Sequence, residues 1–198
     1  MNDYEVAKTI NCPDGIRLFN LNDFKSCYEI YRYYVDHSVY NLDLVPDSED
    51  AFLESILKNM DFPFLAAEHE GEIIGYGTAH HYRPKEGYQH AAELTIYFKD
   101  GPHYGLAGAL ADTLTEILKM QNIRTEIACI TASNKKSRRM SQKRGFEEYG
   151  YLKEAAVKKG EYQDVIWMAR QIQNEEKPAD QLEDFIPFIR FIQPDKPC

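Results

Sequence analysis

Residues 91–121 constrain the fold of this 198-residue chain more than any other stretch. In AELTIYFKD, the apolar residues Leu94, Ile96 and Phe98 take every second position, which is the period of a strand with one face against a core. The turn formers GPHYG come next, and leucine and isoleucine then recur at helical spacing in LAGALADTLTEILKMQN. The pattern predicts a strand, a glycine turn and an amphipathic helix in direct succession.

The glycine turn is a candidate anion site. A helix that begins directly after a turn presents backbone N–H groups without intrahelical partners, and its dipole adds about half a positive charge there. Gly105, Ala107 and Gly108 are small enough for the backbone to approach a phosphate, and Gly105 can adopt a positive φ. A turn that only packs well is the alternative, and the sequence matches neither a Walker A loop nor the three-glycine dinucleotide fingerprint.

The charge balance argues against a nucleic-acid partner. Acidic residues outnumber basic ones by 32 to 23, and the formal net charge of -9 disfavours an extended nucleic-acid surface. The hydrophobic share of 43% is ample for the core of one domain of this length. Partners are expected to be small molecules or proteins.

The four cysteines are Cys12, Cys27, Cys129 and Cys198, without CxxC spacing or neighbouring histidines of the zinc-site type. They are interpreted as free thiols in a reducing compartment, and no metal site is expected. The N-terminus has no apolar run of signal-peptide length, and no stretch approaches the ~20 apolar residues that span a bilayer. The expected location is the cytoplasm, without a membrane partner.

Periodicity and turn residues also predict the other elements. The strand after the central helix is expected to lie parallel to the strand before it, because a strand-helix-strand unit forms a right-handed crossover. The predicted elements are a strand at 15–19, a helix capped by Asn22 or Asp23 and ending near His37, a helix starting at Pro46-Asp47-Ser48, a hairpin at 64–68 and 73–80, a strand at 125–131, a helix capped by Asn134 and closed by Gly145, and strands at 146–155 and 162–172.

The last 26 residues differ from the rest. NEEKPADQLED is typical of a solvated linker, whereas DFIPFIRFI after it is dense in phenylalanine and isoleucine. Left in water, that apolar patch would promote aggregation. We therefore expect a domain at 1–172 and a linker and tail at 173–198 that docks on the body or on a partner subunit, with a homodimer as one possibility.

The order of elements resembles the GNAT superfamily of acyl-CoA-dependent N-acetyltransferases, and within it the phosphinothricin and methionine-sulfoximine acetyltransferases. The similar segments run from about Ile16 to Met168. They are EIYRYYVDHSV, PFLAAEHEGEIIGYGTAHHYRPKEGYQHAAELTIYF, NKKSRRMSQKRGFEEYGYL and KKGEYQDVIWM. The Tyr-x-His-x-x-Glu pattern at Tyr88, His90 and Glu93, with Arg83-Pro84 upstream, is their most specific part.

The resemblance implies an α/β (α+β) fold with a mixed, mostly antiparallel sheet flanked by helices. A splay is expected between the central strand (about 91–99) and the next one (about 125–132), with acetyl-CoA in it and its pyrophosphate on the glycine turn. The family loop Gln/Arg-x-x-Gly-x-Gly/Ala is one residue short here, with a histidine at the cation position. The implied cofactor-binding residues are Ile96, Tyr97, Phe98, His103, Tyr104, Gly105, Leu106, Ala107, Gly108, Asn134 and Ser137.

Amine acetylation requires a neutral amine, which makes a carboxylate base useful. At pH 7, neutralising an α-amine of pKa ~8 costs about 1.4 kcal/mol, and a lysine-like amine of pKa ~10.4 costs about 4.6 kcal/mol. Glu93 is the candidate base, directly or through a water, and its side chain has the parity of Thr95 and Tyr97. The alternative is a structural ion pair. His90 is expected to assist or orient Glu93, or else to be a surface histidine.

Two further features follow from the resemblance. Backbone N–H groups near Tyr97 and Phe98 would meet the thioester oxygen. Ser141 stands where many members have a tyrosine that protonates the leaving thiolate, and a serine is a much weaker acid.

The helix after Asn134 carries six cations, which are either a solvated face or partly phosphate contacts: Lys135, Lys136, Arg138, Arg139, Lys143 and Arg144.

The predicted activity is transfer of the acetyl group from acetyl-CoA to the free amine of a small molecule, an amino acid or an amino-acid-like compound. Direct transfer in a ternary complex is expected, because no cysteine stands beside the site motifs. Tyr31, Arg83 and Tyr88 are the candidate substrate contacts. Two alternatives stay open: a non-catalytic CoA-binding or interaction module, and an acetyltransferase for protein or peptide amines.

Overall fold

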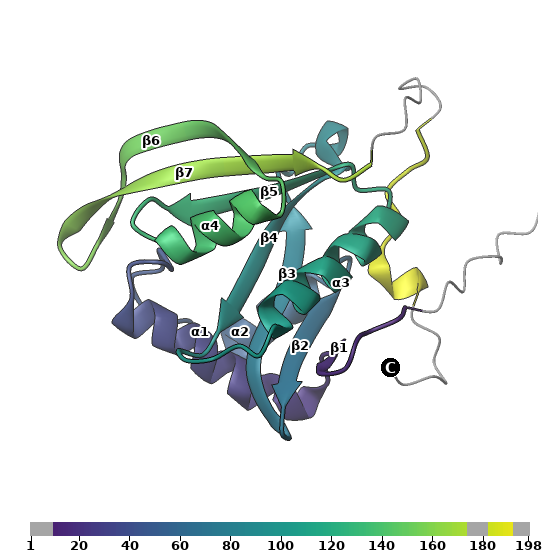
Figure 1. The fold of residues 1–198 in the computed structure, drawn as a ribbon, viewed down its shortest axis with the longest axis horizontal. Helices are drawn as coiled ribbons and strands as arrows, with labels where there is room; N and C mark the ends of the chain where they lie inside the picture. The colour runs from purple at the N-terminus through teal and green to yellow at the C-terminus, as the bar shows by residue number, and fades with distance from the viewer. Residues whose placement is uncertain (1–9, 174–181, 192–198) are drawn as a thin grey trace, which may run out of the picture.

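The computed structural model describes residues 10–173 and 182–191. Seven strands form one sheet in the order β1-β2-β3-β4-β5-β7-β6, and helices pack against it (Figure 1). Among the strands of the described residues, β4 and β5 are the one parallel pair, which confirms the predicted mixed, mostly antiparallel sheet. The elements are β1 (Ile16–Leu18), α1 (Phe24–His37), α2 (Glu49–Lys58), β2 (Phe64–His69), β3 (Glu72–His81), β4 (Ala91–Phe98), α3 (Leu106–Met120), β5 (Thr125–Thr131), α4 (Lys135–Lys143), β6 (Glu147–Lys158) and β7 (Glu161–Gln171).

Strand alternation divides the core into two layers. Leu65 and Ala67 of β2 pack with the apolar stripe of α3, whereas Ala66 between them packs with α1 and α2. Successive strand residues point to opposite faces, so α3 covers one face of β1 to β4 and the first two helices cover the other. No helix in the described ranges is long and apolar enough to cross a membrane.

The first helix begins where predicted, with Asp23 at its N-cap position, although the Asp23 side chain makes no capping hydrogen bond to α1. A 3-10 turn at Leu21–Asp23 precedes α1, and this turn is capped by Asn20, whose side chain accepts a hydrogen bond from the Asn22 amide at 2.8 Å. The Asp23 carboxylate accepts from the Asn20 amide at 2.8 Å and pairs with Arg17 at 2.6 Å. This reciprocal capping box satisfies more backbone donors than a cap at Asn22 or Asp23 would.

The central strands diverge, as predicted. β4 and β5 pair only from Ala91 with Thr125 to Glu93 with Ile127. Beyond that point β4 continues to Phe98 and β5 to Thr131 with no ladder between them. The second half of β4 therefore has β3 on one side and an opening on the other.

Residues 182–191 lie on the body of the domain. The Phe188 amide donates to the Asp61 carbonyl at 2.9 Å, and Gln121 Nε2 donates to the Ile186 carbonyl at 2.9 Å. Phe188 and Phe191 are buried in the cluster that contains α3, whereas Ile189 is 52% exposed. The remainder of the tail, including Ile192, lies outside the described residues.

The contrast between Phe188 and Ile189 gives a test of this docking. We expect Phe188→Ala to lower the free energy of unfolding by about 3 kcal/mol, because it leaves a cavity in the main core. Ile189→Ala, at an exposed position, should lower it by less than about 0.5 kcal/mol. Urea unfolding measures both values, and equal effects would contradict docking on the body. Light scattering on the same variants shows whether the exposed apolar surface changes the oligomeric state.

Candidate active site

The divergence of β4 and β5 opens a cleft of about 980 Å³. One wall is the second half of β4, from Glu93 to Phe98, and the opposite wall is β5 from Ala128 to Thr131. The C-terminal part of α1 and the N-terminal turns of α3 and α4 complete it. A cavity of this size is large enough for an extended organic ligand.

The turn before α3 forms one end of the cleft. Gly105 has φ +82° and precedes the first helical residue. The Leu106 amide donates to the His103 carbonyl at 2.8 Å and the Gly108 amide to the Gly105 carbonyl at 3.1 Å. In the described part of the chain the amides of Gly105 and Ala107 have no acceptor, and Ala107 borders the cleft. Fewer backbone amides of this turn are thus left without an acceptor than the sequence predicts. The Leu106 side chain packs in the core.

The two residues before Gly105 differ in orientation. His103 borders the cleft, with its ring 4.8 Å from that of Phe98 and its Nε2 3.1 Å from the Lys99 carbonyl oxygen. Tyr104 is 59% exposed and stacks on His69 with ring centroids 3.7 Å apart. Of this pair, only His103 lies where a ligand in the cleft would touch it.

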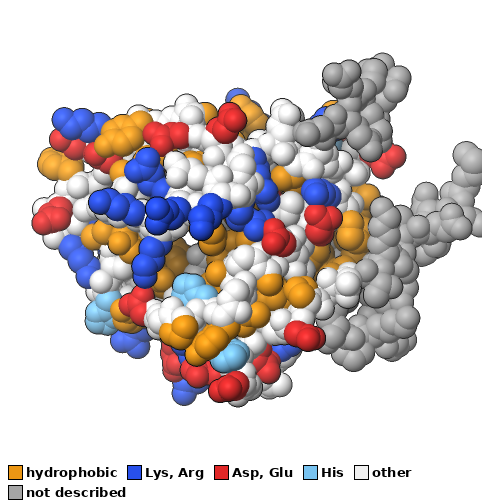
Figure 2. Space-filling model, viewed as in Figure 1, with side chains coloured by type: hydrophobic (Ala, Val, Ile, Leu, Met, Phe, Trp, Pro, Cys, Tyr) orange, Lys and Arg blue, Asp and Glu red, His pale blue; other side chains and the backbone are white. Residues whose placement is uncertain are grey.

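The start of α4 also borders the cleft. Asn134 caps the helix by accepting a hydrogen bond from the Ser137 amide at 3.1 Å, and both residues border the cleft. Lys and Arg side chains gather over α4 (Figure 2). Arg138 pairs with Glu148 at 3.2 Å, so this cation is engaged on the surface. The cations of this segment that line the cleft are Lys135, Lys136 and Arg144.

One backbone hydrogen bond indicates which β4 amides face the cleft. The Lys99 amide donates to the Ile74 carbonyl at 2.8 Å, toward β3. Because the residues of a strand that bond to a given antiparallel neighbour alternate, the Tyr97 amide also belongs to the β3 ladder. The amides of Ile96 and Phe98 point to the cleft side instead. Tyr97 contributes its side chain to the cleft wall rather than its N–H.

Glu93 lies where the pairing of β4 with β5 ends. Its side chain borders the cleft and is 19% exposed. Burial raises the pKa of this carboxyl above its ordinary value, and the nearby Arg83 cation offsets part of the rise. No Lys or Arg of the described ranges lies within ion-pair distance of it, so a structural ion pair has no partner here. A partly buried carboxylate with raised proton affinity suits a general base.

The histidine beside Glu93 is His80, its cross-strand neighbour on β3, with Nε2 3.8 Å from Glu93 Oε2. Burial lowers the pKa of His80, with a smaller contribution from His81, so a neutral imidazole faces the carboxylate at neutral pH. His90 precedes β4, and its Nδ1 lies 2.8 Å from the Asn122 carbonyl oxygen. The structure therefore brings His80 next to the candidate base. The role of His90 stays a prediction.

Arg83 and Tyr88 belong to an aromatic cluster near Glu93. The Arg83 guanidinium lies 4.8 Å from the ring centroid of Tyr82 and 5.9 Å from that of Trp167. Tyr88 meets Tyr82 edge-on with ring centroids 5.7 Å apart. This cluster places a cation on aromatic faces next to a carboxylate.

Tyr31 lies in a second, smaller pocket of about 280 Å³ beneath the first two helices. Its hydroxyl donates to Asp43 Oδ2 at 3.1 Å and accepts from the Asp47 amide at 3.1 Å. Thr95 and Tyr97 line both this pocket and the main cleft. The two spaces therefore adjoin each other along the face of β4 that carries Glu93.

Comparison with known proteins decides the family. The profile of the acetyltransferase (GNAT) domain matches residues 16–167, which is most of the chain. The chain belongs to the GNAT acetyltransferase family. It is an acyl-CoA-dependent N-acetyltransferase, and the resemblance seen in its sequence is confirmed.

Relatives of this GNAT enzyme share much of its length. The phosphinothricin N-acetyltransferase of Streptomyces coelicolor is 29% identical over 156 residues, which cover 76% of this chain and 91% of that protein. An L-methionine sulfoximine/L-methionine sulfone acetyltransferase of Pseudomonas paraeruginosa is 29% identical over 109 residues, 54% of this chain and 63% of that protein. The crystal structure of a phosphinothricin acetyltransferase from Sinorhizobium meliloti in complex with AcCoA has a TM-score of 0.78 and 27% identity, and covers 87% of this chain and 97% of that chain.

A cysteine borders the cleft of this GNAT enzyme. The sequence predicts direct transfer because no cysteine stands beside the site motifs, yet Cys129 of β5 lines the cleft in the folded chain. Burial, with a contribution from the Glu93 charge, raises the pKa of the Cys129 thiol to about 11. The thiol is therefore protonated at neutral pH and is a poor nucleophile. Ser141 also borders the cleft and is buried.

The sequence does not indicate three residues of the site: His80 beside Glu93, and Cys129 and Asn41 in the cleft wall. The position of His80 opposite Glu93 can be inferred only when the register of β3 on β4 is known, and the loop between these strands does not specify that register. Asn41 donates from Nδ2 to the Tyr97 hydroxyl at 3.2 Å, and it comes from a connector without any periodic pattern. No signal in the sequence points to Asn41 or to Cys129.

Proposed function

We propose that this enzyme transfers the acetyl group of acetyl-CoA to the free amine of a small molecule, an amino acid or an amino-acid-like compound, in a ternary complex. The observation that carries the proposal is the cleft between β4 and β5, which joins a partly buried carboxylate to the N-terminal turns of α3 and α4. Relatives that are named for phosphinothricin and methionine sulfoximine support the substrate class.

The residues of the cleft fit acetyl-CoA. Free amides at Gly105 and Ala107 stand at the positive end of the α3 dipole, where a diphosphate is favoured. The cations that line the cleft at α4 add to this potential. Asn134 and Ser137 would contact the pantetheine part, and the cleft-side amides of Ile96 and Phe98 would meet the thioester oxygen. When bound, acetyl-CoA supplies an activated acetyl group.

Glu93 accepts the proton that the amine must lose. As a neutral amine forms the new C–N bond and the C–S bond breaks, the amine proton passes to the carboxylate, directly or through a water. CoA leaves as the thiolate and takes its proton from solvent. The raised pKa of Glu93 brings its proton affinity closer to that of the amine, which makes the transfer less unfavourable. His80 lies beside Glu93 as a neutral neighbour, with its Nε2 3.8 Å from Glu93 Oε2.

The surroundings of Glu93 favour a small amine over a peptide. The adjoining pocket is small, about 280 Å³, and residues of α1 and α2 line it, including Tyr31 and Phe52. On the other side, the Arg83 guanidinium is available to a substrate carboxylate close to the amine. An α-amino acid carries both groups, and Tyr88 contributes to the aromatic cluster around that cation.

A panel of amines tests this proposal. We expect thiol release from acetyl-CoA with free amino acids and amino-acid-like compounds at a kcat/KM at least about tenfold above that with their carboxamides, because the amide removes the charge that Arg83 would meet. Peptides with a free N-terminus serve as the comparison. Better turnover of peptides than of free amino acids would contradict the substrate class. Background release with every amine, while acetyl-CoA still raises the melting temperature, would contradict acetyl transfer itself.

A further inference from the structure

The ladder between β4 and β5 covers only three residue pairs at one end of the cleft. The two arms of the sheet must therefore be held apart, at a defined distance, by contacts elsewhere. On one arm, α3 packs against β1 to β4. The other arm consists of β5, β7, β6 and α4, and two of its arginines contact α3.

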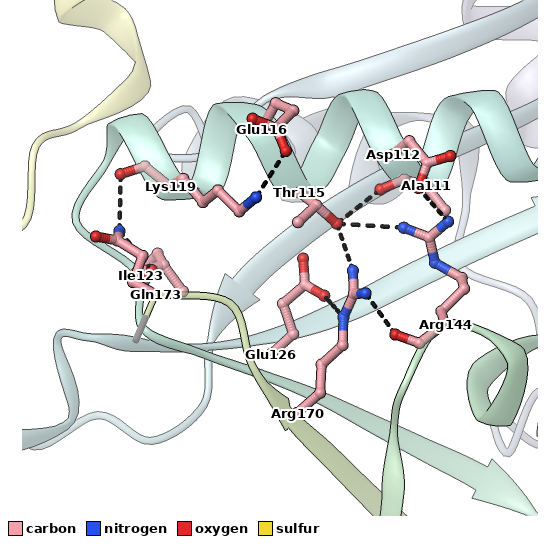
Figure 3. A network of polar contacts seen from close by, with 10 residues as sticks. All are labelled: Ala111, Asp112, Thr115, Glu116, Lys119, Ile123, Glu126, Arg144, Arg170 and Gln173. Atoms are coloured by element: carbon pink, nitrogen blue, oxygen red, sulfur yellow. Dashed lines mark hydrogen bonds and ion pairs between the residues drawn. The ribbon is translucent and has the colours of Figure 1, made fainter. Parts of the chain in front are cut away.

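The first of these is Arg170 of β7. Its Nε lies 2.7 Å from an oxygen of Glu126, a β5 carboxylate that is fully buried. Its Nη2 donates to Thr115 Oγ1 on α3 at 2.8 Å, and its Nη1 donates to the Arg144 carbonyl at 2.5 Å. Figure 3 shows this guanidinium between the carboxylate and the helix.

The second is Arg144, in the turn between α4 and β6. Its Nη1 pairs with Asp112 on α3 at 2.5 Å and lies 3.5 Å from the Gly108 carbonyl oxygen. Its Nη2 donates to the same Thr115 hydroxyl at 3.3 Å (Figure 3). Both arginines thus converge on one side chain of α3, and each is neutralised by its own carboxylate.

The Thr115 hydroxyl uses its full hydrogen-bonding capacity in this network. It donates to the Ala111 carbonyl at 2.9 Å and accepts from both arginines. A hydroxyl has one donor and two acceptor sites, so no capacity remains. The side chain is buried, which makes each of these bonds costly to lose.

We propose that Thr115 is a positioning residue for the acetyl-CoA cleft. Through Arg144 and Arg170 it fixes the distance between the N-terminal half of α3 and the arm that carries α4. Ala107 and Ala111 of α3 border the cleft on one side, and Arg144 borders it on the other. The inference rests on the proposed placement of acetyl-CoA between these arms.

Thr113 provides a matched control for the test. It lies on the same helix, is buried to the same degree, and its hydroxyl donates to the Ala109 carbonyl at 2.9 Å, just as Thr115 donates to Ala111. Valine has the shape of threonine without its hydroxyl. Thr113→Val and Thr115→Val therefore lose the same helical hydrogen bond, and only the second loses the two arginine contacts.

We expect Thr115→Val to raise the KM for acetyl-CoA by about five- to tenfold, with a smaller change in kcat, because two charge-assisted hydrogen bonds between the arms are lost. Thr113→Val should stay within about twofold of the parent, and Thr115→Ser should restore the parent KM because it retains the hydroxyl. Asp112→Asn, at a side chain that is 73% exposed, provides a milder variant that weakens the Arg144 contact and should shift KM in the same direction.

The outcomes separate this inference from the proposed function. If Thr115→Val and Thr113→Val lower the melting temperature but leave KM equal to that of the parent, Thr115 is merely structural. Failure of serine to restore KM, or an unchanged KM in Asp112→Asn, also overturns the inference. If acetyl-CoA does not raise the melting temperature of the parent enzyme, the proposed binding of acetyl-CoA in the cleft is contradicted, independently of Thr115.

Discussion

Replacement of Glu93 by glutamine is expected to lower kcat by about 100- to 1,000-fold, because the variant has no carboxylate to take the amine proton. Glutamine preserves the shape of the side chain at this partly buried position, so the loss reports on proton transfer. Steady-state thiol release at saturating acetyl-CoA measures it. Glu86→Gln, in an exposed turn of the loop before β4, is the control and should keep the parent kcat.

The pH dependence adds a second readout to the same variant. Only the ionised carboxylate is a base, so kcat/KM of the parent should rise with pH through the raised pKa of Glu93. That limb of the profile should disappear in Glu93→Gln. A parent profile without such a limb, or a variant that retains more than about a tenth of the parent kcat, would contradict the assignment.

The Glu93→Gln variant should lose activity without losing thermal stability at pH 7. A carboxyl whose pKa is raised in the folded state contributes most to stability below its unfolded pKa of about 4.3, and this contribution is lost as pH rises through the folded pKa. Above that range the ionised Glu93 destabilises the native state. Glu93→Gln should therefore melt at or above the temperature of the parent at pH 7, which separates a catalytic defect from unfolding.

Replacement of Ala107 by glutamate should raise the Kd for acetyl-CoA by about 100-fold. A like charge ~4 Å from a phosphate repels it by up to about 4 kcal/mol at an effective dielectric constant of 20. The Ala107 amide has no acceptor among the described residues and the residue borders the cleft, so the new carboxylate would lie where the diphosphate is placed. Isothermal titration calorimetry measures the change directly.

Glutamine at the same position separates charge from bulk. Ala107→Gln adds nearly the same volume without the charge, and its Kd should rise by less than about tenfold. An acidic residue in the first turn of a helix is itself favourable, so the melting temperature of Ala107→Glu without ligand should not fall. Equal losses in both variants would show that the diphosphate does not lie on this turn.

Local patterns determined much of this protein in advance. The alternation in β4 already separated the parity of Glu93 and Tyr97 from that of Leu94 and Ile96, and in the structure Leu94 and Ile96 pack with the α3 cluster whereas Tyr97 packs with the cluster of the first two helices. Gly105 was predicted to permit a positive φ before α3, and it has one. These features depend on side-chain period and backbone sterics within a few residues, and a sequence records both directly.

Contacts between distant segments were decided only by the tertiary structure. The pairing of His80 with Glu93 depends on the register across a loop whose length does not specify it. The meeting of Arg144 and Arg170 at Thr115 requires three elements to pack at defined distances. Spacing along the chain contains no such information, because packing selects one arrangement from many that the local pattern allows. The sequence thus determined the elements and the candidate base, whereas packing determined which side chains surround it.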